Sequence, residues 1–435
     1  MCNCILCFLD EINHFKWRAE AQKEGQSNLQ HVRNYHKILL EKIDSIAPIS
    51  DCPYHNQVHG EMAQFWNEKY KEIPLKVLVS DFLNEIELIY EKWNNGYVVE
   101  ATQLMESIIT FLRKENISAS IPHILFRNRI ERPDEKIIDK NELWHIPFYK
   151  RSLVKNYRYS ISGRPMLYLG SSVYDVVQET RPSDELKKPM SSEQKERNKL
   201  SLFVLNKSKL GNGQKLKIFD LTNPFTRLNL AMNVLANSNV NINGRLFNDD
   251  LEMIGYKVRT FMLMSCCSFP TTNSDSCFYE EYVISQLLTE VLYKRGFSAI
   301  KYSSVRINPG LLKNPKYDIW HNNCLRENYI FFTKYSEFHE HDSELKKIFR
   351  NTIPQSYASL LCKTGCNDEQ WLDNLQTKMV KMGMINDGNV TDDNIIAYNF
   401  NRRNVFVDGK HYWDTEYGKC EMNMLKQAEE EGLFY

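Results

Sequence analysis

Three side chains in one stretch of the sequence have types suited to cleaving a nucleotide glycosidic bond: Arg158, Tyr168 and Glu179. An arginine binds phosphate oxygens through parallel N–H donors, and a tyrosine ring stacks on a flat cationic ring. A glutamate stabilises the positive charge that develops on a ribose as its glycosidic bond breaks. These groups suit a substrate that contains a pyrophosphate, a cationic ring and a ribose, and NAD contains all three.

The segments around these residues predict how they are positioned. The run around Arg158 is typical of a strand, SISGRP of a turn, and MLYLG of a second strand. The segment SSVYDVVQET is typical of a helix capped by Ser171 or Ser172, because a serine hydroxyl often accepts a hydrogen bond from the first turn. Consecutive elements of this kind would bring the three side chains to one corner of the fold.

The same stretch resembles the RES domain, a family named for its characteristic Arg, Glu and Ser. The family has an Arg on one strand, a Tyr in an LYLGSS-like strand and a Glu in the following helix, which Arg158, Tyr168 and Glu179 match. The family serine matches Ser304 in FSAIKYSSVR. Three further segments match in order, LKIFDLTNP, FMLMSCCSF and EYVISQLLTEVLYKRG, so the resemblance covers about residues 125–335.

The resemblance implies an α+β fold with a mixed-sheet core, similar to diphtheria toxin and other ADP-ribosyltransferases, with NAD as the substrate. It implies that Glu179, Arg158, Tyr168 and Ser304 are catalytic, and that the last three also contact NAD.

A second expectation from the resemblance concerns the strand HILFRNRIERP, which is similar to a family strand whose arginine faces the NAD pocket. Arg127 or Arg129 would then bind a phosphate. A solvent-facing position for these two side chains is the alternative.

The function implied by the resemblance is that of an NAD-degrading enzyme that cleaves the nicotinamide–ribose bond. Water as the acceptor gives a glycohydrolase, and inorganic phosphate gives a phosphorylase. Many RES proteins are bacterial toxins, so we expect a toxin or antiphage defence effector with an antitoxin or other regulatory partner. One alternative is ADP-ribosylation of a protein target, and another is a non-catalytic module that binds a nucleotide or nucleic acid.

Two ligand pairs near the start of the sequence are candidates for a structural zinc site. Cys4 and Cys7 form a C-x-x-C pair, and Cys52 and His55 form a C-x-x-H pair. Together they supply the four sulfur and nitrogen ligands of a tetrahedral zinc ion. Isolated thiols and a loop histidine are the alternative.

The periodicity of the sequence predicts three regions. Residues 1–116 are predicted to form a regulatory or dimerising helical module, with a helical hairpin that turns at Asn94–Gly96. Residues 117–335 are expected, from the resemblance, to form the RES-like catalytic domain. Residues 336–435 form a small C-terminal α/β extension of helices and a hairpin at Asp408–Gly409, for which a winged-helix-like unit and an oligomerisation tail are both considered.

The composition is that of an ordinary globular protein, with 42% hydrophobic and 25% charged residues in 435. Lys plus Arg and Asp plus Glu are balanced at 55 each, which disfavours nucleic acid as the main partner. The sequence has neither a long apolar run nor a secretory leader pattern, so a cytoplasmic protein that does not bind membranes is expected. We also expect a homo-oligomer.

Overall fold

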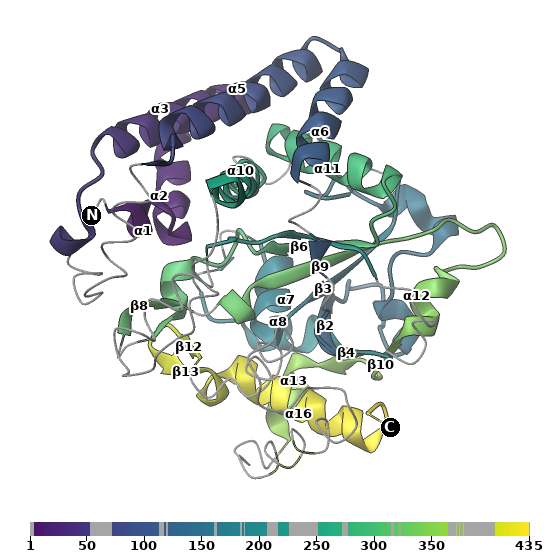
Figure 1. Ribbon diagram of the computed structural model, residues 1–435. Helices are drawn as coiled ribbons and strands as arrows, with labels where there is room; N and C mark the ends of the chain where they lie inside the picture. Colours follow the sequence, from purple (N-terminus) through teal and green to yellow (C-terminus); the bar gives the residue numbers. More distant parts are fainter. Residues whose placement is uncertain are drawn as a thin grey trace.

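A computed structural model of the chain shows a central β-sheet packed between helices (Figure 1). The structure describes residues 4–52, 72–112, 117–118, 121–160, 163–182, 185–186, 188–206, 216–225, 251–271, 277–314, 317–321, 323–363, 371, 374, 377 and 405–434.

In the part of the chain that the structure describes, the central sheet is mixed and contains nine strands, in the order β1-β5-β6-β9-β3-β2-β4-β10, with β11 also paired to β4. Strands β5 and β6 are parallel, and the other strand pairs described in this sheet are antiparallel. The strand bounds are β1 Ile117–Ser118, β2 Ile124–Ile130, β3 Met166–Gly170, β4 Asn198–Leu205, β5 Ile218–Leu221, β6 Ala299–Ser303, β9 Glu327–Phe332, β10 Phe349–Asn351 and β11 Gln355–Ser356. The predicted α+β class with a mixed sheet is confirmed.

Helices of the N-terminal region lie above the sheet in Figure 1. They are α1 Ile5–Phe8, α2 Glu11–Ala21, α3 Asn28–Asp44, α5 Leu75–Asn94 and α6 Val98–Leu112. The predicted hairpin is present: α5 ends at Asn94, and Gly96 adopts a φ of 81°, a left-handed conformation that glycine tolerates without strain.

Two further helices, α10 Leu251–Cys266 and α11 Val283–Lys294, join the N-terminal helices to the sheet. Helix α10 contacts α5 and β5, and α11 contacts α6. One continuous apolar cluster contains Phe82 of α5, Phe261 of α10 and Ile300 of β6. The apolar core therefore continues across the predicted boundary at residue 116.

The C-terminal region is also built onto the central sheet. It supplies β10 and β11, and helix α16 (Glu416–Glu430) lies below the sheet in Figure 1, in contact with α7 and β4. The other helices are α7 Val173–Thr180, α8 Ser192–Arg197, α12 Ser343–Ile348 and α13 Tyr357–Cys362. Asp408 and Gly409, both with positive φ, make the predicted turn between β12 (Phe406–Val407) and β13 (Lys410–His411).

The remaining elements are short. They are the strands β7 Lys313–Asn314 and β8 Tyr317–His321 and the 3-10 helices η1 Ile49–Asp51, η2 Lys140–Leu143, η3 Phe148–Leu153, η7 Glu280–Tyr282, η8 Pro309–Leu312, η9 Asn323–Leu325 and η10 Tyr412–Asp414. None of the helices in the described ranges is both long and apolar enough to cross a membrane.

Candidate active site

The register of three neighbouring strands places two of the predicted site residues, Tyr168 and Ser304, on one face of the sheet. Asn328 of β9 pairs with Gly170 of β3 on one side and with Tyr302 of β6 on the other. Tyr168 precedes Gly170 by two residues, and Ser304 follows Tyr302 by two. Because side chains two residues apart share a face of a strand, Tyr168, Asn328 and Tyr302 point to the same side, and Ser304 continues this row past the end of β6.

Gly170 allows helix α7 to lie directly on β3. A Cβ atom at this position would come within 2.5 Å of Val176 Cγ1 and 2.9 Å of a carboxylate oxygen of Asp175. The helix is capped as predicted, because the Ser172 hydroxyl accepts a hydrogen bond from the Asp175 N–H at 2.9 Å. Glu179 follows Asp175 by one helical turn, so the close approach at Gly170 also sets the position of Glu179.

Three polar groups surround the Glu179 carboxylate. The Ser304 hydroxyl donates a hydrogen bond to Oε1 at 2.5 Å, and the Asn328 side-chain amide donates to the same oxygen at 3.3 Å. Arg306 Nε lies 3.8 Å from Oε2. Ser304 is fully buried, whereas 25% of the Glu179 side chain is exposed. The site therefore holds one carboxylate oxygen tightly while the group stays accessible to solvent.

Asp175 lies beside Glu179 but is completely buried. The Asn328 side-chain amide donates a hydrogen bond to its Oδ1 at 3.1 Å. Burial raises the pKa of Asp175 well above its usual range, and the nearby negative charge of Glu179 raises it further. Asp175 therefore keeps its proton to a higher pH than an exposed aspartate does, which avoids a second negative charge next to Glu179.

Arg158 does not lie on a strand, and this prediction was wrong. It lies in a turn that is closed by a bridge between Tyr157 and Ser160. Its two terminal guanidinium nitrogens donate to the carbonyl oxygens of Cys267 and Phe269, both at 2.7 Å. In this structure the guanidinium therefore binds the backbone that follows helix α10.

Tyr282 links Arg158 to the Glu179 cluster. The Arg158 guanidinium lies over the Tyr282 ring, 4.8 Å from its centroid, in cation–π geometry. Burial raises the pKa of Tyr282, while the positive charges of Arg158 and Arg306 oppose that shift and Glu179 adds to it. The charges of Arg158, Arg306 and Glu179 therefore all influence the Tyr282 hydroxyl.

Tyr168 is half-buried on β3, and two neighbours hold it. Arg127 of β2 donates a hydrogen bond to the Tyr168 backbone carbonyl at 2.8 Å, and the Tyr157 ring meets the Tyr168 ring edge-on at 5.9 Å between centroids. Burial and the nearby charge of Arg129 lower the pKa of Arg127 to about 10. Arg127 therefore supports the strand that carries Tyr168.

Arg129, the other arginine predicted on this strand, is bound to groups outside the Glu179 cluster. Its guanidinium forms an ion pair with Glu135 and donates to the backbone carbonyl of Glu142 at 3.0 Å.

A buried ion pair that the sequence did not predict holds the backbone of Ser304 in place. Arg326 Nη2 lies 2.9 Å from a Glu11 carboxylate oxygen, and the two side chains are only 1% and 2% exposed. The same nitrogen donates to the Ser304 carbonyl at 2.6 Å, and the Ser304 N–H donates to the Arg326 carbonyl at 2.7 Å. The N-terminal helix α2 thus contacts the loop that holds a predicted site residue.

Arg306, Asn328 and Arg326 were missed in the sequence analysis. Arg306 could have been noticed, because it follows Ser304 by two residues in KYSSVR. Asn328 is one polar residue in the apolar strand ENYIFF, which is a weak signal. Nothing in the sequence could have paired Arg326 with Glu11, which lies 315 positions away.

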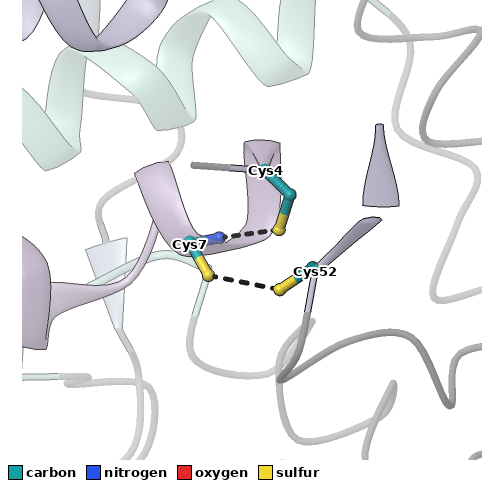
Figure 2. Close-up of side chains that lie close together, drawn as sticks. All are labelled: Cys4, Cys7 and Cys52. Carbon is teal, nitrogen blue, oxygen red and sulfur yellow. Dashed lines mark hydrogen bonds between the residues drawn. The ribbon is translucent and has the colours of Figure 1, made fainter. Parts of the chain in front are cut away.

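The predicted metal ligands are brought together in part. The sulfur atoms of Cys4, Cys7 and Cys52 all lie within 4.8 Å of one another, as Figure 2 shows. His55, the fourth predicted ligand, lies outside the described residues.

Comparison with known proteins gives one distant relationship. No family model matches the chain, and no solved structure matches it. The chain is similar to a protein of Bacillus subtilis (strain 168) that bears the name "Putative toxin YopC". The two are 26% identical over 294 residues, which cover 65% of this chain and 59% of the relative, so the chain spans about three fifths of that relative's length.

Proposed function

We propose that this protein cleaves the nicotinamide–ribose bond of NAD, with Glu179 as the group that acts on the ribose. The observation that carries the proposal is the setting of Glu179: a partly exposed carboxylate that accepts hydrogen bonds from Ser304 and Asn328, with a cationic guanidinium beside it. Glu179 and Ser304 are also residues to which the RES resemblance gives catalytic roles.

The chemistry requires little from a general acid, because nicotinamide is already a cationic leaving group. The barrier lies in the positive charge that grows on the ribose as the bond stretches. A carboxylate held in place beside that ribose stabilises the charge without having to reorganise during the reaction. The hydrogen bonds from Ser304 and Asn328 fix Oε1, and Oε2, which lies 3.8 Å from Arg306 Nε, would face the ribose.

The other groups would bind and orient the dinucleotide. Tyr168 would stack on the nicotinamide ring, as the resemblance implies. The resemblance gives the phosphate contact to Arg158, with Arg127 or Arg129 as a further phosphate ligand. Arg306, which lies beside Glu179 with 32% of its side chain exposed, is an additional candidate for contact with phosphate or ribose oxygens.

The name of the Bacillus subtilis relative supports a biological role as a toxin. We propose a toxin or defence effector with an ADP-ribosyltransferase-like core, which acts in the cytoplasm on cellular NAD and is restrained by an antitoxin or another regulatory partner. We also propose that the protein forms a homo-oligomer. The acceptor is water or inorganic phosphate, and transfer of ADP-ribose to a protein is the alternative.

The test is direct detection of nicotinamide after incubation of the purified full-length protein with NAD. Chromatography of the second product distinguishes the acceptors: ADP-ribose indicates water, a phosphorylated ADP-ribose indicates phosphate, and labelled protein indicates transfer. Glu179→Gln should abolish release. Glu193→Gln, a change to a glutamate whose side chain is 78% exposed, should not. The proposal fails if the wild-type protein releases no nicotinamide with water, phosphate or cellular protein as the acceptor.

A further inference from the structure

Cys4 and Cys7 form a compact knuckle near the start of the chain. Cys4 caps the short helix α1, and its sulfur accepts a hydrogen bond from the Cys7 backbone N–H at 3.4 Å. An N–H group that points at a cysteine sulfur stabilises negative charge on that sulfur. Two residues separate the cysteines, so one turn of chain directs both sulfurs to the same side (Figure 2).

Cys52 reaches this knuckle from a different segment. Cys52 follows the 3-10 helix η1, and a parallel bridge between Cys4 and Ala47 holds this segment beside the start of the chain. The sulfurs of Cys7 and Cys52 are 3.7 Å apart. This separation is far beyond the roughly 2.05 Å of a disulfide bond.

The sulfur spacing matches that of a tetrahedral metal site. Zinc–sulfur bonds of about 2.3 Å at tetrahedral angles place two sulfurs about 3.8 Å apart. The 3.7 Å between the Cys7 and Cys52 sulfurs agrees with this value, and the Cys4 sulfur lies within 4.8 Å of both. All three side chains are buried, at 0%, 5% and 0% exposure, so a bound ion would be shielded from water.

We propose that Cys4, Cys7 and Cys52 bind a structural zinc ion through their thiolates. Three clustered, buried sulfurs favour a soft divalent ion, which binds thiolates and offsets their mutual repulsion. Each thiol loses its proton to solvent as the ion binds, and no electron transfer takes place. The proposal rests on these three sulfurs alone.

The ion would fix the segment that carries Glu11. Helix α1 leads directly into α2, where Asp10 caps the helix and Glu11 begins it. His14 of α2 is bound back to this turn, since its Nε2 donates to the Phe8 carbonyl at 2.6 Å. A zinc ion at the knuckle would therefore hold the end of α2 whose Glu11 pairs with Arg326 beneath Ser304. This role is structural and does not depend on the proposed NAD chemistry.

The test is metal analysis of the full-length protein purified without chelator from zinc-supplied cells. We expect about one zinc per chain, released when a mercurial reagent modifies the cysteines. Cys7→Ser and Cys52→Ser should each lose the zinc. Cys266→Ser, a matched change to a fully buried cysteine outside the trio, should keep it.

A second measurement covers the case in which the ligand variants do not fold. Removal of metal from the wild-type protein with a strong chelator should lower its thermal unfolding temperature, and added zinc should restore it. Wild-type protein that contains no zinc, that contains iron instead, or that keeps its zinc in Cys7→Ser and Cys52→Ser overturns the proposal. NAD cleavage enters neither measurement, so failure of the zinc site and failure of the proposed function are separate results.

Discussion

The Ser304 hydroxyl donates a hydrogen bond to Oε1 of Glu179 across 125 positions of the sequence. Ser304 is buried where β6 ends, and Glu179 is near the end of α7. A bond between these elements fixes the rotamer of the glutamate before any substrate arrives. Such preorganisation is what a group needs in order to stabilise charge that exists only in the transition state.

Replacement of Glu179 by Gln tests its proposed role. The amide keeps the shape of the side chain but loses its negative charge, so we expect turnover to fall by about a hundredfold to a thousandfold. NAD affinity should change much less, because the charge on the ribose develops only in the transition state. Rate measurements and calorimetric titration with NAD separate the two effects. Turnover close to that of the wild type would remove Glu179 from the mechanism.

Ser304→Ala removes the hydrogen bond while leaving the carboxylate charge. We expect turnover to fall by about tenfold to a hundredfold, since Glu179 would sample several rotamers and only some of them face the ribose. Ser303→Ala is the matched control: Ser303 is the preceding residue, also buried, and lies on the other face of the strand. Equal losses in the two variants would indicate damage to the strand instead of an effect on Glu179.

Replacement of Arg158 and replacement of Arg306 are expected to have different effects on stability and on the KM for NAD. Arg158→Ala removes two hydrogen bonds to backbone carbonyls and a cation–π contact, so it should destabilise the fold by about 2–4 kcal/mol. Arg306→Ala should mainly raise the KM for NAD, with a smaller loss of stability. Urea unfolding and steady-state kinetics of both variants check this. A higher KM with unchanged stability in Arg158→Ala would instead support the direct substrate contact that the sequence predicts.

Local signals in the sequence predicted many of the elements correctly. Ser172 caps α7, Gly96 ends the first helix of the hairpin, and Asp408–Gly409 makes a tight turn, because each of these features depends on a few neighbouring residues. Ser304, which the resemblance matches to the family serine, lies beside Glu179 in the structure. Hydrogen bonds within one segment therefore account for these local predictions, whereas the α+β class was expected from the resemblance.

Long-range contacts account for what the sequence analysis missed. The alternation around Arg158 is typical of a strand, but the Gln286 amide donates to the carbonyls of Tyr157 and Ser160, at 3.0 and 3.3 Å, and holds this segment as a turn. Gln286 lies 126–129 positions away from these residues, so the local sequence pattern does not reveal the contact. The ion pair between Glu11 and Arg326 was not predicted for the same reason.

The Glu11–Arg326 pair predicts that the N-terminal helices stabilise the part of the fold that carries Ser304 and Glu179. Glu11→Ala would leave Arg326 charged and buried without its partner, at a cost of about 3–5 kcal/mol. Asp44→Ala is the control: it breaks the pair of Asp44 with Lys76, whose side chains are 58% and 53% exposed, and should cost less than about 1 kcal/mol. Urea unfolding gives both values.

A fragment that begins at residue 117 extends this prediction. It lacks Glu11 and the apolar residues that α5 and α6 contribute to the shared core, so we expect it to be unfolded and inactive. A stable fragment that cleaves NAD would show that the N-terminal helices are dispensable.

The burial of the neutral His14 ring predicts how the stability of the folded protein depends on pH. It is completely buried: Nε2 donates to the Phe8 carbonyl, and Nδ1 therefore accepts from the Tyr35 hydroxyl, which requires the neutral ring. Burial, with a smaller effect of the nearby Arg18 charge, lowers the pKa of His14 to about 3. An unfolded chain, with an ordinary histidine pKa of about 6.5, binds this proton much more readily than the folded protein does.

The stability that neutral His14 contributes is therefore fully present above about pH 6.5 and is lost as the pH falls toward 3. The expected slope is about 1.4 kcal/mol per pH unit below pH 6. His145 and His341, whose pKa values burial lowers to about 4, add slopes of the same sign. Urea unfolding at pH 7, 6, 5 and 4 should show a shallower pH dependence for His14→Gln than for the wild type, by about the slope of one histidine. If the unfolding free energy has the same pH dependence in both proteins, His14 becomes protonated in the folded state as readily as in the unfolded chain.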